Sequence, residues 1–220
     1  MRLTRHHPLI AALALSCALP AMAADVQLAD LMQLLAQTKS AKATFVEKKY
    51  IGIVDTPVES SGELTFTAPD KLEKRTLKPK AEALILDGTA LTVDMAGKRR
   101  TIRLQDYPEV AAFVESIRGT LAGDRSALEK TYKLDLTGSR EKWQLVLTPT
   151  QARMSKIITR IRMQGAQADI RSIDFDQADG DRSEMVVTNV SPLARPLTPD
   201  PRKSLLTVAA YDPVSTRRLQ

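Results

Sequence analysis

Short segments in which apolar and polar side chains alternate dominate this sequence, in two groups: residues 43–104 and residues 133–190. Residues 62–67 alternate most strictly, which predicts Leu64 and Phe66 on a buried face. The same pattern predicts solvent exposure for the polar side chains of that segment, Glu63, Thr65 and Thr67. Strands do not alternate with helices as they would in a parallel α/β sheet. We therefore expect one large antiparallel sheet, curved or barrel-like, with helices on one side.

One helix is expected before the strands. Leu28, Leu31, Met32 and Leu35 have the i, i+3, i+4, i+7 spacing of an amphipathic helix, and Asp25 can cap its start.

Two more helices are expected between the strand groups. The first has Asp106 as its cap, Pro108 in its first turn and Gly119 at its end. Its apolar stripe consists of Val110, Phe113, Val114 and Ile117. Residues 126–132 predict a short second helix.

The first 23 residues have the features of a secretory signal peptide. Arg2 and Arg5 form a basic start, residues 9–19 are mostly apolar, and Ala21-Met22-Ala23 is an A-x-A cleavage site. The apolar run is shorter than the roughly 20 residues of a membrane-spanning helix. We expect cleavage after Ala23.

Cys17 permits an alternative. Leu15-Ser16-Cys17 loosely resembles a bacterial lipobox, which would make Cys17 a lipidated N-terminus. Ala14 stands where such motifs usually carry Leu, so a cysteine placed incidentally within the signal peptide is favoured.

The leader holds both histidines, His6 and His7, and the only cysteine. The mature chain would therefore have no disulfide, no Cys nucleophile, no Ser-His-Asp triad and no ordinary zinc site. We expect no cofactor, no metal and no catalytic residue. An enzyme using paired carboxylates is the remaining enzymatic alternative, but no close acidic pair in an apolar setting is visible.

The positive charge lies mostly at the two ends of the chain. Removing the leader lowers the net charge from +6 to +4, and residues 191–220 hold five basic and two acidic side chains. The body, residues 24–190, is close to neutral, which argues against nucleic acid as a partner. Residues 191–220 contain five of the 12 prolines and predict an extended tail, with one strand at residues 205–210.

Five motifs, in order, resemble those of the LolA family of periplasmic lipoprotein carriers. They lie within residues 26–190, and they are Thr44-Phe45-Val46-Glu47, Gly62 with Leu64, Phe66 and Pro69, Asp87-Gly88 with Leu91, Leu147-Thr148-Pro149, and Asp181-Arg182-Ser183. The resemblance implies a mainly β fold with some α: an incomplete antiparallel β-barrel covered by lid helices over an apolar cavity. It implies three regions, a signal peptide at 1–23, a carrier domain at 24–190 and a tail at 191–220.

The resemblance also implies a function. The cavity would hold acyl chains of a lipoprotein or other lipid, carried from an inner-membrane donor to an outer-membrane acceptor by a monomeric protein in the periplasm of a Gram-negative bacterium. A non-transporting lipid- or lipoprotein-binding sensor or anchor module on the same fold is the alternative. The side chains expected to line the cavity or its lid are Leu31, Leu35, Phe45, Leu64, Phe66, Leu84, Leu86, Leu91, Val93, Phe113, Ile117, Leu145 (or its neighbour Val146) and Ile161.

The chain departs from the family at two positions. Ala68 stands where the family has an Arg tied to lid closure and hand-over, and Glu47 stands where it usually has Gln. Aromatic side chains, common around the family's cavity, make up only 4% of the sequence. These departures indicate a LolA-like paralogue with a different cargo or partner.

Overall fold

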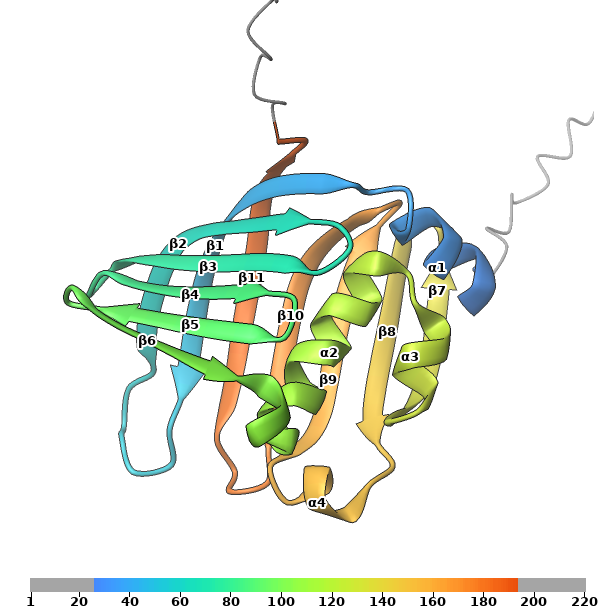
Figure 1. The fold of residues 1–220 in the computed structure, drawn as a ribbon. Helices are drawn as coiled ribbons and strands as arrows, with labels where there is room; N and C mark the ends of the chain where they lie inside the picture. Colours follow the sequence, from blue (N-terminus) through green and yellow to red (C-terminus); the bar gives the residue numbers. More distant parts are fainter. Residues whose placement is uncertain (1–25, 194–220) are drawn as a thin grey trace, which may run out of the picture.

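The structure is a computed structural model, and it describes residues 26–193, except for the side chains of residues 108–110, 112 and 113. The expectations for the signal peptide, Asp25, Cys17 and the strand at 205–210 lie outside these residues. Within them, the dominant element is one sheet of eleven antiparallel strands (Figure 1). The strands are β1 (Ser40–Tyr50), β2 (Val58–Thr67), β3 (Lys71–Lys78), β4 (Glu82–Asp87), β5 (Ala90–Met95), β6 (Lys98–Arg103), β7 (Tyr132–Ser139), β8 (Lys142–Pro149), β9 (Ile158–Ala166), β10 (Asp169–Gln177) and β11 (Arg182–Ser191).

The sheet consists of two meanders joined at one pair of strands. Strands β1 to β6 follow one another across one half, strands β7 to β11 follow one another across the other, and β1 pairs with β11 between them. In Figure 1, β3–β6 run nearly crosswise to β8–β10, so the sheet is strongly curved. Strands β6 and β7 are the two edges and do not pair with each other. The predicted incomplete antiparallel barrel is therefore confirmed.

Helices lie on one face of this sheet (Figure 1). They are α1 (Leu28–Leu35), α2 (Pro108–Ala122), α3 (Arg125–Glu129) and α4 (Ala152–Ser155), with a 3-10 turn at Leu104–Asp106. The helix predicted at residues 126–132 ends earlier, at Glu129, because Tyr132 begins β7. Both predicted boundaries of α2 are wrong. Asp106 does not cap α2, because it belongs to the 3-10 turn and its carboxylate pairs with Arg103 at 3.1 Å. The residue that precedes α2 is Tyr107.

The end of α2 also differs from the prediction. The helix continues past Gly119 to Ala122 and stops at Gly123, whose φ of 68° is left-handed. Gly119 has a packing role instead, since a Cβ there would lie 3.0 Å from a methyl carbon of Leu128. The short helix α3 begins after Asp124, whose carboxylate accepts a hydrogen bond from the Ala127 amide at 3.0 Å.

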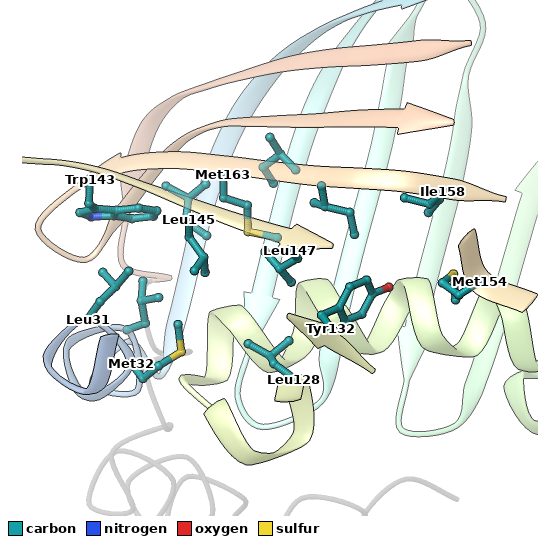
Figure 2. Packing of buried hydrophobic residues seen from close by; sticks show 14 residues of the cluster. Leu31, Met32, Leu128, Tyr132, Trp143, Leu145, Leu147, Met154, Ile158 and Met163 are labelled. Carbon is teal, nitrogen blue, oxygen red and sulfur yellow. The ribbon is translucent and has the colours of Figure 1, made fainter. Parts of the chain in front are cut away.

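The main hydrophobic core fills the space between β7–β10 and the helices α1 and α3 (Figure 2). Trp143 on β8 is almost fully buried, and its indole nitrogen donates a hydrogen bond to the Gln167 carbonyl at 2.9 Å. Leu31 and Met32 of α1, together with Leu128 of α3, face this side of the sheet in Figure 2. The cluster therefore holds the helices against one half of the sheet.

The strand β2 follows the predicted alternation only in part. Phe66 is buried and Thr67 is exposed, as expected, but Leu64 is only half-buried. Glu63 and Thr65 are also half-buried rather than exposed, and Glu63 forms an ion pair with Lys42 of β1 at 2.9 Å. Leu64 is incompletely covered because it faces a cavity, which is described below.

The acidic run near the end of the chain belongs to a strand and a hairpin. Asp174 and Asp176 on β10 pair with Arg162 and Arg160 of β9, the first pair at 3.1 Å. Burial raises the pKa of Asp174, although the Arg162 guanidinium acts in the opposite direction. In the part of the chain that the structure describes, no group of three or more acidic, His or Cys side chains could hold a metal ion.

Gly165 is required by its contact with Trp143. A Cβ at Gly165 would lie 2.2 Å from the indole ring and 2.3 Å from the Asp169 carbonyl oxygen. We expect Gly165→Ala to lower the free energy of unfolding by about 1–3 kcal/mol, because the packed ring or backbone would have to move. Urea denaturation measures this change. Gly52→Ala is the control, since its nearest neighbour would be 4.0 Å away. Equal midpoints for the two variants would contradict the assigned contact.

Candidate functional site

A cavity of about 590 Å³ lies between the concave face of the sheet and helix α2. Three side chains of α2 reach it, Val114, Ile117 and Leu121, at the i, i+3, i+7 spacing of one helix face. Leu35 of α1 contributes at one end. Most of the wall comes from aliphatic side chains of the sheet, and a volume of this size falls within the range of small-molecule sites, about 300–1,000 Å³.

The strand register explains why the wall is apolar. Phe66, Leu72, Leu86 and Leu91 are paired in sequence across β2, β3, β4 and β5, so they form one row on the concave face. All four line the cavity. Leu72 and Leu91 are only half-buried, although they are on the inner face. The row therefore presents apolar surface to an unfilled space.

The other half of the sheet supplies the opposite part of the wall. Its lining residues share the inward face of β9, β10 and β11 or the turns beside them: Ile157, Ile158, Ile170, Ile173, Phe175, Met185, Val187 and Val190. The sequence analysis named none of these. Part of the signal was available, because Ile173 and Phe175 alternate with polar side chains within the strand group predicted at residues 133–190.

Of the thirteen side chains predicted to line the site, seven line this cavity. They are Leu35, Leu64, Phe66, Leu84, Leu86, Leu91 and Ile117. Val93 is half-buried but does not reach the cavity. Phe113 lies on α2, but its side chain is outside the described part of the structure. Ligand contact by any of these residues stays a prediction.

Four other predicted residues are packed into the protein instead. Leu31, Leu145 and Ile161 are fully buried in the main core, because α1 and α3 cover that part of the sheet. Phe45 is buried in a smaller cluster with Ala43, Met185 and Val187, where β1 meets β11. Val146, the alternative to Leu145, pairs in register with Arg162 of β9 and does not line the cavity.

A charged pair interrupts the apolar wall. Lys74 of β3 donates a hydrogen bond to the Glu47 carboxylate of β1, and both side chains line the cavity. Only 15% of the Glu47 side chain and 27% of the Lys74 side chain are exposed. Ser183 of β11 donates to the same carboxylate, as does Ser60 of β2 at 3.4 Å. Four strands thus contribute one polar cluster.

The cluster keeps the carboxylate ionised. Burial alone would raise the pKa of Glu47, but the Lys74 ammonium and the hydroxyl groups of Ser183 and Ser60 outweigh it and hold the pKa below its usual value. The sequence analysis noted Glu47 only as a departure from the family and passed over Lys74. A lysine flanked by Leu72 and Thr76 at inward-facing positions was the signal for this site.

A model of the LolA-like family of outer membrane lipoprotein carrier proteins matches residues 18–194. The chain therefore belongs to this family, which confirms the resemblance drawn from the five motifs. The described residues contain no helix that is both long and apolar enough to cross a membrane. A search of curated protein sequences found no match.

Several solved structures are similar to this chain. A LolA superfamily protein from Nitrosomonas europaea has 11% sequence identity and a TM-score of 0.45, covering 78% of this chain and 96% of that one. A putative outer membrane lipoprotein-sorting protein domain from Vibrio parahaemolyticus has 11% identity and a TM-score of 0.41, covering 81% and 97%. The MucA/MucB complex of Pseudomonas aeruginosa matches at 16% identity and a TM-score of 0.45, covering 78% of this chain and 59% of that chain.

The lowered pKa of Glu47 predicts a pH-dependent effect of Glu47→Gln. Because the folded-state pKa lies below the unfolded one, the ionised carboxylate stabilises the fold at neutral pH, and this contribution is lost as the pH falls through the folded-state value. We expect the variant to lose about 1–3 kcal/mol of unfolding free energy at neutral pH. The difference from wild type should shrink below about pH 4, where carboxylates protonate.

Urea unfolding at several pH values measures this difference. Glu59→Gln is the matched control, since Glu59 lies on the neighbouring strand and its ion pair with Lys48 is 60% exposed on the Glu59 side. A constant difference between wild type and Glu47→Gln across the pH range would contradict the ionised pair.

Proposed function

We propose that this protein is a periplasmic carrier that binds the acyl chains of a lipoprotein or another lipid and moves it toward the outer membrane. One observation carries the proposal: an apolar cavity of about 590 Å³ under α2, in a member of a lipoprotein-carrier family. The cavity-facing row of Leu72, Leu86 and Leu91 offers the kind of surface that an acyl chain buries.

The energetics favour a carrier of this shape. Each CH₂ group of an acyl chain contributes about 0.8 kcal/mol when it leaves water, so one long chain gains on the order of 10 kcal/mol. Free diffusion of such a chain through an aqueous compartment is correspondingly unfavourable. Half-buried side chains such as Leu64 and Leu84 would be covered by the bound chain, so binding removes apolar surface of the protein from water as well.

Helix α2 serves as the lid in this proposal. Its residues Val114, Ile117 and Leu121 face the cavity, while the 3-10 turn before it and the left-handed Gly123 after it connect it to its neighbours. The helix lies over the concave face in Figure 1. Displacement of α2 would expose the acyl chain and allow its release.

The compartment and the partners complete the proposal. The leader at residues 1–23 would direct the chain to the periplasm of a Gram-negative bacterium, and residues 24–190 would act as the carrier domain with the tail at 191–220 appended. The protein would work as a monomer between an inner-membrane donor and an outer-membrane acceptor. Catalysis and nucleic acid have no part in this scheme.

Ala68 favours a second candidate function. It follows β2, where its amide donates a hydrogen bond to the Lys39 carbonyl at 2.8 Å, and it stands where the family has an Arg associated with hand-over. A chain without that guanidinium would bind an acylated partner without transferring it. The second candidate is therefore a sensor or anchor module that holds lipid or lipoprotein in the same cavity.

Leu84→Glu tests the cavity. Leu84 lies on β4 and lines the cavity, so an ionised carboxylate there would have to be desolvated whenever an acyl chain binds. We expect at least a tenfold loss of acyl lipid that copurifies with protein secreted to the periplasm, equivalent to about 1.4 kcal/mol or more. Lipid extraction followed by mass spectrometry measures it.

Val186→Glu is the control for that experiment. Val186 lies on β11, is 54% exposed and does not line the cavity. It should retain the lipid of the wild type. Equal lipid content in all three proteins, or none in any, would remove the support for acyl-chain binding.

A transfer assay separates the two candidate functions. Protein loaded with a triacylated lipoprotein is mixed with outer-membrane vesicles, and the lipoprotein recovered in the vesicle fraction is measured over time. A carrier gives a rising vesicle-bound fraction, whereas a sensor or anchor module keeps the lipoprotein in the soluble fraction.

A further inference from the structure

The charged cluster in the cavity wall consists of Glu47, Lys74, Ser60 and Ser183. Lys74 is surrounded by apolar groups: it pairs in register with Leu64 on one side and Leu84 on the other. Its ammonium nitrogen also lies 5.0 Å from the centroid of the Phe45 ring. The ammonium is thus held in a fixed place within a mostly apolar wall, to which Lys42, Lys49, Glu73 and Asp169 also contribute.

Stability alone is a poor reason for this arrangement. Two charges withdrawn from water lose hydration, and apolar side chains of similar size often serve a buried position equally well or better. Glu47 and Lys74 are far less exposed than the neighbouring pair Lys48–Glu59, whose side chains are 48% and 60% exposed. A polar group on the ligand, in contact with Glu47 and Lys74, would explain why this charged pair lies in the wall of an apolar cavity.

The hydrogen-bonding capacity of the pair indicates which polar group that is. The Glu47 carboxylate already accepts from Lys74, Ser60 and Ser183, whereas a lysine ammonium has three donors and only one is directed at Glu47. The cluster therefore offers a donor to the ligand. An acceptor on the ligand, such as a carbonyl oxygen, completes it.

The charge of the pair indicates that this acceptor is neutral. Glu47 balances the charge of Lys74, so a ligand carboxylate would be repelled by Glu47 while losing its own hydration. An ester or amide carbonyl carries no such cost. The adjacent row of Leu72, Leu86 and Leu91 lies next to Lys74 in the strand register and offers a path for the hydrocarbon.

We propose that Glu47 and Lys74 form a head-group anchor in which Lys74 donates a hydrogen bond to the carbonyl of an ester- or amide-linked acyl chain, and in which Glu47 excludes the carboxylate of a free fatty acid. This inference rests on the proposed function, since it concerns the same cavity. It narrows the ligand class from lipid in general to acyl chains in ester or amide linkage.

Displacement of a fluorescent dye tests the anchor. The neutral dye N-phenyl-1-naphthylamine reports on occupancy of the apolar cavity, and methyl palmitate and palmitate compete for it. Wild-type protein should bind methyl palmitate about tenfold more tightly than palmitate, because the palmitate carboxylate is repelled by Glu47 and loses its hydration. Equal affinity for the two competitors would overturn the inference.

Three variants make the test specific. Glu47→Gln removes the balancing charge, so palmitate affinity should rise about tenfold and the preference should disappear or reverse. The double variant Glu47→Leu with Lys74→Met should keep the dye affinity but lose about tenfold in methyl palmitate affinity. Lys74→Arg keeps a charged donor and should keep the wild-type preference for methyl palmitate. If the double variant does not fold, Lys74→Arg and Glu47→Gln together test the inference.

The control is the double variant Glu59→Leu with Lys48→Met. It removes an ion pair from the same strand β1 and its neighbour β2, but from residues that do not line the cavity. Both affinities should match wild type. If the cavity variants behave like this control, the anchor is wrong while acyl-chain binding stands; if wild-type protein binds neither dye nor lipid, the proposed function itself fails.

Discussion

The pairing of β1 with β11 is the interaction on which the rest of this structure depends. It joins two meanders that are each locally connected, and it aligns Phe45 with Val187 and Glu47 with Met185. The Ser183–Glu47 hydrogen bond across this seam joins residues 136 positions apart. Closing a loop of that length loses chain entropy before stabilising contacts can form. The β1–β11 pairing would therefore form late in folding. Without it, the cavity would have only half its wall.

The two halves of the curved sheet are filled in different ways. Helices α1 and α3 supply the side chains that pack against β7–β10, where Trp143 and Leu145 are buried. Across β2–β5 the equivalent inward-facing leucines meet a cavity beneath α2. The cavity also reaches inward-facing residues of the other half, such as Ile173 and Met185, so the packed core forms part of the cavity wall.

Much of this fold follows from local patterns, and much of the cavity does not. Alternation predicts the strands and the inward direction of Leu64, Leu84 and Leu91, because a period of two is a property of each strand alone. The same alternation describes Leu145 and Ile161, which are packed beneath helices. Only the placement of the helices distinguishes the two sets, and that placement depends on contacts between distant parts of the chain.

The contact between Glu47 and Lys74 could not be predicted from the sequence for a related reason. Glu47 and Lys74 lie on strands separated by β2, so their contact depends on the register of two strand pairs together. Helix ends were mispredicted on a smaller scale: Gly119 and Gly123 are both plausible stops, and only packing against Leu128 shows that the first serves another purpose.

An unclosed sheet leaves backbone hydrogen-bonding groups at its borders, and such borders invite strand addition by other chains. At the β6 border, the consecutive basic residues Lys98, Arg99 and Arg100 are all exposed. Arg99 is held by Asp94 at 3.1 Å, which leaves two cations beside it to repel a second copy of the same border. Such a row of like charges on an edge strand is a common feature that disfavours pairing between two copies of the same edge.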